Sequence, residues 1–190
     1  KRFILEKKPT ILYGPSGTGK TSSVYALVEE LNCEILEINA SDKRNKENIV
    51  NIIGSSSRQM SLFNKEKIIL IDEVDGIAGN EDRGGIQALM QVLRDTKHTI
   101  VFTANDPYSS KLSELRKKCC LIEFNPVTAE EIFLKLKFIL ENERILYSEE
   151  TLRKLVRKSN GDLRAAINDL QALAQGKKEL MEIETVEERE

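Results

Sequence analysis

The eight residues from Gly14 to Thr21, GPSGTGKT, constrain the fold of this chain more than any other stretch. They match the pattern GxxxxGK[ST] completely, between a short β-rich run at residues 10–13 and an amphipathic helical stripe at residues 24–31. Glycines let consecutive backbone N–H groups turn toward a phosphate, and the amino end of the following helix adds positive potential. This order of strand, loop and helix predicts an α/β domain with a phosphate-binding loop.

The residues of this loop have distinct expected roles. Lys20 is expected to reach the β- and γ-phosphates of ATP, and Thr21 to bind Mg²⁺. The backbone that surrounds the phosphates is expected to come from Gly14, Pro15, Ser16, Gly17, Thr18 and Gly19. The alternative is a glycine-rich turn with a chance lysine, which the flanking strand and helix patterns disfavour.

Beyond the loop, predicted strands alternate with predicted helices. Strands are expected at residues 34–40, in KIILIDEVD at residues 67–75, in HTIVFTAND at residues 98–106 and at residues 119–124. Helices are expected near residues 46–53, 86–93 and 112–115. Four consecutive apolar residues, Ile68 to Ile71, are typical of a strand buried on both faces. The alternation predicts βαβ units and a mostly parallel sheet covered by helices on both faces.

The pattern changes after Pro126. Thr128 and Glu131 form a capping-box pattern ahead of a helical stripe, and further helical patterns follow at residues 152–156 and 163–173 without a strand signal. The sequence therefore predicts an α/β nucleotide-binding domain at residues 1–125 and a small all-α domain at residues 126–190. The acidic end, from Lys177 to Glu190, is expected to begin a truncated C-terminal extension.

Two carboxylates follow the apolar strand. Asp72 stands at its end, where it can hold Mg²⁺ through water, and Glu73 can orient and activate an attacking water. The alternative is that these acidic residues, with Asp75, merely cap the strand. Together with the phosphate-binding loop about fifty residues upstream, the pair favours NTP hydrolysis over phosphoryl transfer to a metabolite.

Two further residues are candidates for the nucleotide site. Asn105 ends the strand FTAND, where a neutral amide can position a water or sense the γ-phosphate, although Asn-Asp-Pro is also a common turn signal. Arg164 stands in the first turn of a helix capped by Asp162, where the helix dipole gives a cation no benefit. An external anionic partner is therefore one reading of Arg164, and a solvated arginine is the other.

Composition excludes several classes of function. The net charge of -2 gives no global reason to expect nucleic acid, so such contacts must come from local basic patches. No apolar run of about 18 residues indicates a membrane span, and no signal peptide opens the chain. The three cysteines, Cys33, Cys119 and Cys120, have no metal-binding spacing and are expected to be reduced, mostly buried thiols of a cytoplasmic protein. The lone His98 offers no histidine acid–base chemistry.

From Thr10 to about Ala174, these motifs together with LEINASD and GDLR resemble the AAA+ ATPases, and more narrowly the clamp loaders of the replication factor C type. The resemblance implies a five-stranded parallel sheet in which the strand of Asn105 lies between those of Asp72 and the phosphate-binding loop, followed by a helical lid. It implies ATP and Mg²⁺ as ligands, with Lys20, Glu73, Asn105 and Arg164 as catalytic residues. In that family the arginine of GDLR reaches the phosphates.

The type of clamp-loader subunit is inferred from one position at which this chain differs from the small subunits of the family. Small clamp-loader subunits carry Ser-Arg-Cys before the last strand, and its arginine acts on a neighbour's ATP, whereas this chain has Lys117 and Lys118 before Cys119. Lysine lacks the planar guanidinium fork and does not replace that arginine. The stretch from Asp72 to Leu89 instead resembles the large subunit of archaea. The family's adenine-packing N-terminal segment and its C-terminal collar are missing, so a fragment is expected.

The family resemblance also implies partners: small subunits in a hetero-oligomer, expected to be a pentamer, a sliding clamp and primer–template DNA. Three basic residues near expected helix starts, Lys43, Arg44 and Arg83, are candidates for DNA phosphate contacts, with solvated turns as the alternative. Met60, Leu62 and Phe63 in QMSLF are candidates for insertion into a clamp pocket, with plain core as the alternative.

The expected function is therefore ATP-driven opening and loading of a sliding clamp onto primed DNA. Two alternatives stay open: a nucleotide-gated clamp and DNA interaction module with little turnover, and another AAA+ DNA motor. The absence of a finger arginine speaks against a homohexameric motor, which needs one from every subunit. The expected location is the cytoplasm, at the nucleoid in a prokaryote, or the nucleus in a eukaryote.

Overall fold

A computed structural model describes residues 2–40, 66–78 and 83–180 of the 190-residue chain. The chain forms two compact units. The first comprises Lys1–Gly14 and Lys20–Phe124, and the second comprises Pro15–Gly19 and Asn125–Glu190. The helix predicted at residues 46–53 lies outside the described residues. Within the described ranges, no helix is both long enough and apolar enough to span a membrane.

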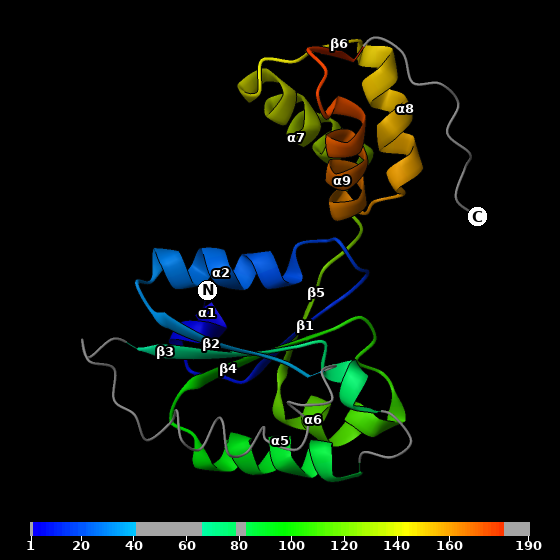
Figure 1. The fold of residues 1–190 in the computed structure, drawn as a ribbon. Helices are drawn as coiled ribbons and strands as arrows, with labels where there is room; N and C mark the ends of the chain where they lie inside the picture. Colours follow the sequence, from blue (N-terminus) through cyan, green and yellow to red (C-terminus); the bar gives the residue numbers. More distant parts are fainter. Residues whose placement is uncertain (1, 41–65, 79–82, 181–190) are drawn as a thin grey trace. The chain divides into compact units, whose positions relative to one another are not determined.

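The first unit is built on a parallel sheet, and the strands of the described residues give the predicted five-stranded architecture (Figure 1). The strands are β1 (Thr10–Tyr13), β2 (Glu34–Asn39), β3 (Lys67–Asp72), β4 (Thr99–Ala104) and β5 (Cys120–Glu123). Their order is β2-β3-β4-β1-β5, and every neighbouring pair is parallel. The strand that precedes Asn105 therefore lies between β3 and β1, as the family resemblance implied.

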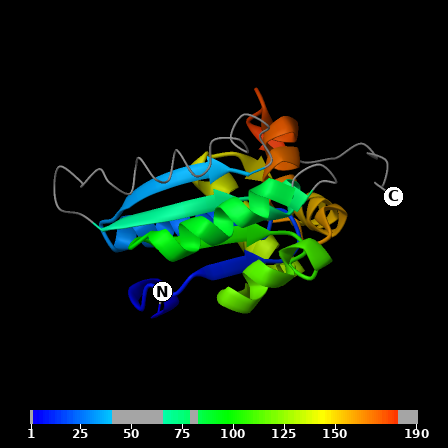
Figure 2. The same ribbon diagram turned by 90° about the horizontal axis from the view of Figure 1, so that it is seen from below.

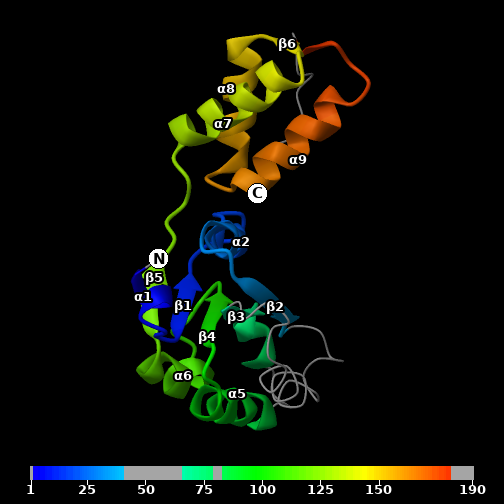
Figure 3. The same ribbon diagram turned by 90° about the vertical axis from the view of Figure 1, so that its left-hand side faces the viewer.

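Helices cover both faces of this sheet (Figure 3). One face carries α2 (Lys20–Glu30), and the other carries α5 (Arg83–Asp95) and α6 (Ser113–Lys118). Figure 2 shows α5 lying along the strands of its face. Among the described residues, a short 3-10 helix, η1 (Val74–Ala78), follows β3, and another, η2 (Ser110–Leu112), precedes α6.

The side chains of β3 point alternately to the two covered faces of the sheet, which explains why its apolar run is unbroken. Ile69 and Ile71 belong to the core that includes Leu89 and Val92 of α5. Ile68 and Leu70 belong to the opposite core, which includes Val24 of α2. Successive side chains of a strand point to opposite faces, so a strand covered on both faces needs apolar residues at every position. All four residues of this run are at most 1% exposed, which confirms the predicted burial.

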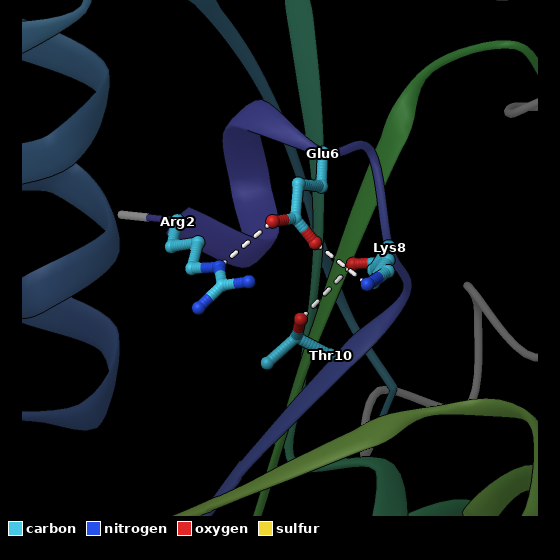
Figure 4. Close-up of polar contacts among 4 residues, drawn as sticks. All are labelled: Arg2, Glu6, Lys8 and Thr10. Atoms are coloured by element: carbon cyan, nitrogen blue, oxygen red, sulfur yellow. Dashed lines mark hydrogen bonds and ion pairs between the residues drawn. The ribbon is translucent and has the colours of Figure 1, made fainter.

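A short helix, α1 (Arg2–Leu5), leads into β1 (Figure 4). The Glu6 carboxylate pairs with Arg2 Nε at 2.8 Å and with Lys8 Nζ at 2.6 Å. The Thr10 hydroxyl donates to the Lys8 carbonyl at 3.0 Å. These contacts lower the pKa of Glu6, chiefly through its hydrogen bond with Arg2. They connect α1 to the strand that delivers the phosphate-binding loop.

The helical part of the second unit comprises α7 (Ala129–Asn142), α8 (Glu149–Ser159) and α9 (Leu163–Ala174). Thr128 and Glu131 form the predicted capping box at the start of α7. Asn160 ends α8 in the left-handed conformation, and Asp162 caps α9. Two strands that the sequence did not signal, β6 (Leu146–Tyr147) and β7 (Glu179–Leu180), pair in parallel. Strands of two residues are too short to show periodicity, which is why the pattern missed them.

The three cysteines are free and only half-buried, so the expectation of mostly buried thiols overstated their burial. Burial raises the pKa of the Cys119 thiol to about 12. A thiol with such a pKa is protonated near neutrality and is a poor nucleophile or metal ligand. This agrees with a structural role for Cys119.

Candidate nucleotide-binding site

The loop of the GPSGTGKT motif runs from the end of β1 at Tyr13 to the start of α2 at Lys20. Gly14 has φ +141°, and a Cβ there would overlap the backbone carbonyl of Phe124. Gly19, immediately before the helix, has φ +91° in the left-handed region. Because side chains disfavour that region, glycine is required where this loop turns into the helix.

Lys20 is the first residue of α2, and it is largely buried, with 9% of its surface exposed. Its ammonium donates to the Gly14 carbonyl at 2.7 Å and to Asn105 Oδ1 at 3.2 Å. The structure therefore brings two predicted site residues, from α2 and from the end of β4, into direct contact. A buried ammonium held at the Gly14 carbonyl is suited to bind phosphate oxygens.

Thr21 and Asp72 form the second contact between predicted site residues. Thr21 Oγ1 donates to Asp72 Oδ1 at 3.0 Å, which joins the start of α2 to the end of β3. A hydroxyl and a carboxylate supply the hard oxygen ligands that Mg²⁺ prefers. No group of three or more His, Cys, Asp or Glu residues in the described ranges could hold a metal ion by itself. The hydroxyl and carboxylate of this pair fit Mg²⁺, which is commonly bound by few protein ligands together with water and substrate phosphates.

Glu73 follows β3 directly and is exposed. Its backbone has φ +55°, the left-handed conformation that a residue with a Cβ rarely adopts. The Glu73 carbonyl accepts from the Gly76 N–H at 2.9 Å, and the Glu73 N–H donates to Thr103 Oγ1 at 3.0 Å. The carboxylate that the sequence predicts to activate water thus extends from a strained backbone, and such backbone often marks a functional site.

Two polar residues with a structural part in the site were not predicted as site residues. Asp75 Oδ2 accepts from the Asn105 N–H at 2.9 Å and so holds the backbone at the end of β4. Thr103, in β4, contacts both Asp72 and Glu73. The sequence had read Asp75 only as a possible strand cap. The relation between Thr103 and Asp72 depends on β4 lying next to β3, so residue spacing alone could not reveal it.

Within the second unit, Ser16 Oγ donates to Asp162 Oδ2 at 3.5 Å, and Thr18 Oγ1 donates to the Pro15 carbonyl at 2.8 Å. Asp162 also accepts from the Ala165 N–H at 2.8 Å as the cap of α9. Arg164 is exposed in the first turn of that helix. Its predicted contact with phosphates stays a prediction.

The predicted partner residues are described only in small part. Lys43, Arg44, Met60, Leu62 and Phe63 lie outside the described residues. Arg83, which was expected just before a helix, is the first residue of α5.

The end of α6 carries the two lysines that the family resemblance was expected to place at the position of a finger arginine. Lys117 and Lys118 are exposed. The neighbouring Arg116 lies over the Tyr108 ring at 5.3 Å and donates to the Pro107 carbonyl at 2.8 Å. The arginine nearest to this position is therefore engaged within its own unit.

Comparison with known proteins adds family models and relatives. Residues 10–125 match the model described as the ATPase family associated with various cellular activities (AAA). Residues 134–175 match the RCF1/5-like AAA+ ATPase lid domain.

Several proteins named replication factor C large subunit are similar to this chain. The one from Nanoarchaeum equitans is 49% identical over 166 residues, which are 87% of this chain and 39% of that protein. Those from Aeropyrum pernix and Staphylothermus marinus are 48% and 45% identical, each over 90% of this chain and over 36% and 40% of the relative. The chain thus spans about two fifths of the length of these relatives.

Proposed function

The chain belongs to the AAA family of ATPases, and on this premise we propose that it binds and hydrolyses ATP as part of a sliding-clamp loader. In this proposal it acts as the large subunit, which helps to open the clamp and load it onto primed template DNA. The observation that carries the proposal is the meeting of four polar residues at the carboxyl end of the sheet. Lys20 contacts Asn105 there, and Thr21 contacts Asp72. The names of the relatives support the choice of clamp loading.

In the proposed reaction, water adds across the bond to the γ-phosphate and gives ADP and phosphate. The loop amides of residues 14–19 and the ammonium of Lys20 bind the phosphates, while Thr21 and Asp72 hold Mg²⁺. Bound Mg²⁺ neutralises phosphate charge. Glu73 accepts the proton of the attacking water, and the amide of Asn105 orients that water. Arg164 contributes positive charge toward the phosphates from the lid.

We propose residues 1–125 as the nucleotide-binding domain and residues 126–190 as the lid with the start of a C-terminal extension. Small subunits complete a hetero-oligomer, proposed to be a pentamer, and one of them supplies the finger arginine to this chain's ATP. Lys43, Arg44 and Arg83 contact DNA phosphates, and Met60, Leu62 and Phe63 contact the clamp. The proposed site of action is the cytoplasm, at the nucleoid of a prokaryote, or the nucleus of a eukaryote.

Single-turnover ATP hydrolysis by the full-length protein, with and without the small subunits, tests this proposal. An arginine finger contributes roughly 10³–10⁵-fold in well-studied GTPases, so we expect the partners to accelerate hydrolysis by at least about tenfold. Small subunits whose Ser-Arg-Cys arginine is replaced by alanine serve as the control and should stimulate far less. If the small subunits do not change the rate of hydrolysis, the proposal that this chain is a clamp-loading subunit is rejected.

Binding to the sliding clamp is tested by the double variant Leu62→Ala/Phe63→Ala. Hot-spot residues each contribute about 2 kcal/mol or more, so we expect the clamp affinity to fall at least about thirtyfold in a pull-down or titration. Leu134→Ala/Phe138→Ala is the matched control, because these apolar side chains of α7 are 56% and 57% exposed on the lid. Equal binding by the two double variants would exclude Leu62 and Phe63 as the clamp contact.

Without a finger arginine, this chain would not promote hydrolysis of a neighbour's ATP, which favours a second candidate function, a nucleotide-gated interaction module that promotes little turnover. The position of the finger arginine holds Lys117 and Lys118, and Arg116 is occupied by Tyr108 and Pro107. The chain would then exchange partners on binding ATP rather than on hydrolysing it. The single-turnover experiment separates the two candidates, because only the clamp-loading ATPase is stimulated by its partners.

A further inference from the structure

Thr103 is a buried polar residue whose hydroxyl contacts both residues that carry the carboxylates of the site. It lies in β4 with 2% of its surface exposed. The parallel ladder pairs Ile71 with Phe102, so the next position of each strand sets Thr103 beside Asp72. A hydroxyl buried to this degree needs hydrogen-bond partners, and here those partners belong to the candidate site.

As a donor, the Thr103 hydroxyl binds Asp72 Oδ1. The same oxygen accepts from Thr21 Oγ1 at 3.0 Å. Two hydroxyls on one carboxylate oxygen hold the group in one orientation, which presents the other oxygen, Oδ2, in a set direction. Thr21 is itself a proposed ligand of Mg²⁺, so of these two hydroxyls Thr103 is the one with no other proposed part in the site.

As an acceptor, Thr103 Oγ1 binds the Glu73 N–H at 3.0 Å. The Glu73 backbone has φ +55°, and its carbonyl is held by the Gly76 N–H at 2.9 Å. A residue with a Cβ keeps this conformation only where its surroundings hold it. The bond to Thr103 is one of these restraints, and it sets the direction in which the Glu73 side chain leaves the chain.

We propose that Thr103 is a positioning residue for ATP hydrolysis. Its single hydroxyl orients the carboxylate of Asp72 for Mg²⁺ and holds the backbone from which Glu73 extends. The metal-binding group and the group that activates water are thereby kept in one arrangement. This inference rests on the proposed function, since it assigns Thr103 a part in the same reaction.

The test compares Thr103→Val with Thr103→Ser in the full-length protein. Valine keeps the shape of threonine but loses both hydrogen bonds, whereas serine keeps the hydroxyl. Replacing groups that orient metal ligands costs about 10–100-fold in metal affinity or activity. For Thr103→Val we therefore expect an approximately tenfold higher Mg²⁺ concentration for half-maximal binding of a fluorescent ATP analogue. The single-turnover rate should fall about 10–100-fold.

A merely structural role of Thr103 would lower binding of the analogue with and without Mg²⁺ alike. The proposed positioning role predicts a different pattern. Binding of the analogue in EDTA, which does not depend on Mg²⁺, should change less than about twofold in Thr103→Val, and Thr103→Ser should stay within about threefold of wild type throughout. Thr99→Val is the matched control, because Thr99 is also buried in β4, at its amino end and away from the site. Thr103→Ala replaces Thr103→Val in these measurements if the latter melts below the assay temperature.

The proposal is overturned if the hydroxyl-free variant matches wild type, or matches Thr99→Val, in both Mg²⁺ dependence and rate. It is also overturned if EDTA binding falls as much as Mg²⁺-dependent binding, because a damaged fold produces that result. Wild-type protein that fails to bind Mg²⁺ and ATP rejects the proposed function and this inference together. Active wild type with an unaffected Thr103→Val rejects the inference alone.

Discussion

Replacing Glu73 with glutamine is expected to lower the single-turnover rate of ATP hydrolysis by about 10²–10⁴-fold, the usual contribution of a general base. Glutamine has the size of glutamate but does not accept the proton of the attacking water. Glu73 is exposed, and its hydrogen bonds to other described residues are those of its backbone with Thr103 and Gly76. The substitution should therefore leave ATP affinity and folding close to wild type. Rapid-quench kinetics with excess protein would measure the rate, and a fluorescent analogue the affinity.

Glu66→Gln is the matched control for this variant. Glu66 is also exposed, and it lies just before the amino end of the same strand, β3, where it pairs with Lys7. Exposed ion pairs contribute about 0–1 kcal/mol, so Glu66→Gln should change neither rate nor affinity measurably. An unchanged rate in Glu73→Gln would show that another group activates the water.

Replacing Lys20 with alanine is expected to remove most ATP binding. Hydrogen bonds to charged groups contribute about 1.5–3 kcal/mol, which predicts a dissociation constant about 10–150-fold higher. Hydrolysis at low ATP should fall further, because the same ammonium would also stabilise charge as the γ-phosphate leaves. Unlike Glu73→Gln, this variant should lose binding and turnover together. Isothermal titration with ATP and Mg²⁺ would check the affinity.

The fold of the Lys20 variant has to be measured as well. Lys20 donates to the Gly14 carbonyl and to Asn105, so alanine leaves both oxygens without these bonds. Thermal melting without nucleotide would report that cost separately from the loss of ATP binding. Lys97→Ala is the control, since Lys97 is exposed before the amino end of β4, at the opposite edge of the sheet. ATP affinity equal to wild type in Lys20→Ala would refute the role of this loop.

The elements of the fold that sequence predicted well were those with long or strong patterns. The four apolar residues of β3 are buried as expected, and the stripe of α2 packs against one of their two cores with Val24 buried and Leu27 and Val28 partly buried. A doubly covered strand and an amphipathic helix leave clear signatures in the sequence. The capping box at Thr128 was also predictable, since its two hydrogen bonds join residues three apart in the chain. Most of the correct fold prediction therefore came from patterns among residues that are close together in the chain.

Contacts between strands were less accessible to sequence reasoning. The contact of Lys20 with Asn105 and that of Thr103 with Asp72 both depend on the order of the strands in the sheet. Residue spacing predicts which side chains end each strand, but not which strands lie side by side. The strand order itself came from resemblance to a family. Asp75 illustrates this limit. The sequence indicated only a possible strand cap, but in the structure its carboxylate accepts from the Asn105 N–H and so takes part in the site.

The insertion of β4 between β1 and β3 also bears on how the chain reaches its native state. Thr10 pairs with Val101, and Ile68 pairs with Thr99, so β4 bridges two parts of the chain that have no ladder to each other without it. Pairings between such distant residues slow folding, because the entropy of closing the loop is lost before the contacts form. On the ribosome, β1 and β3 emerge before β4, the strand that lies between them, exists. A nucleotide stabilises only chains in which its binding site has already formed. Bound ATP would therefore stabilise the completed sheet, but it would not help the strands to pair earlier in folding.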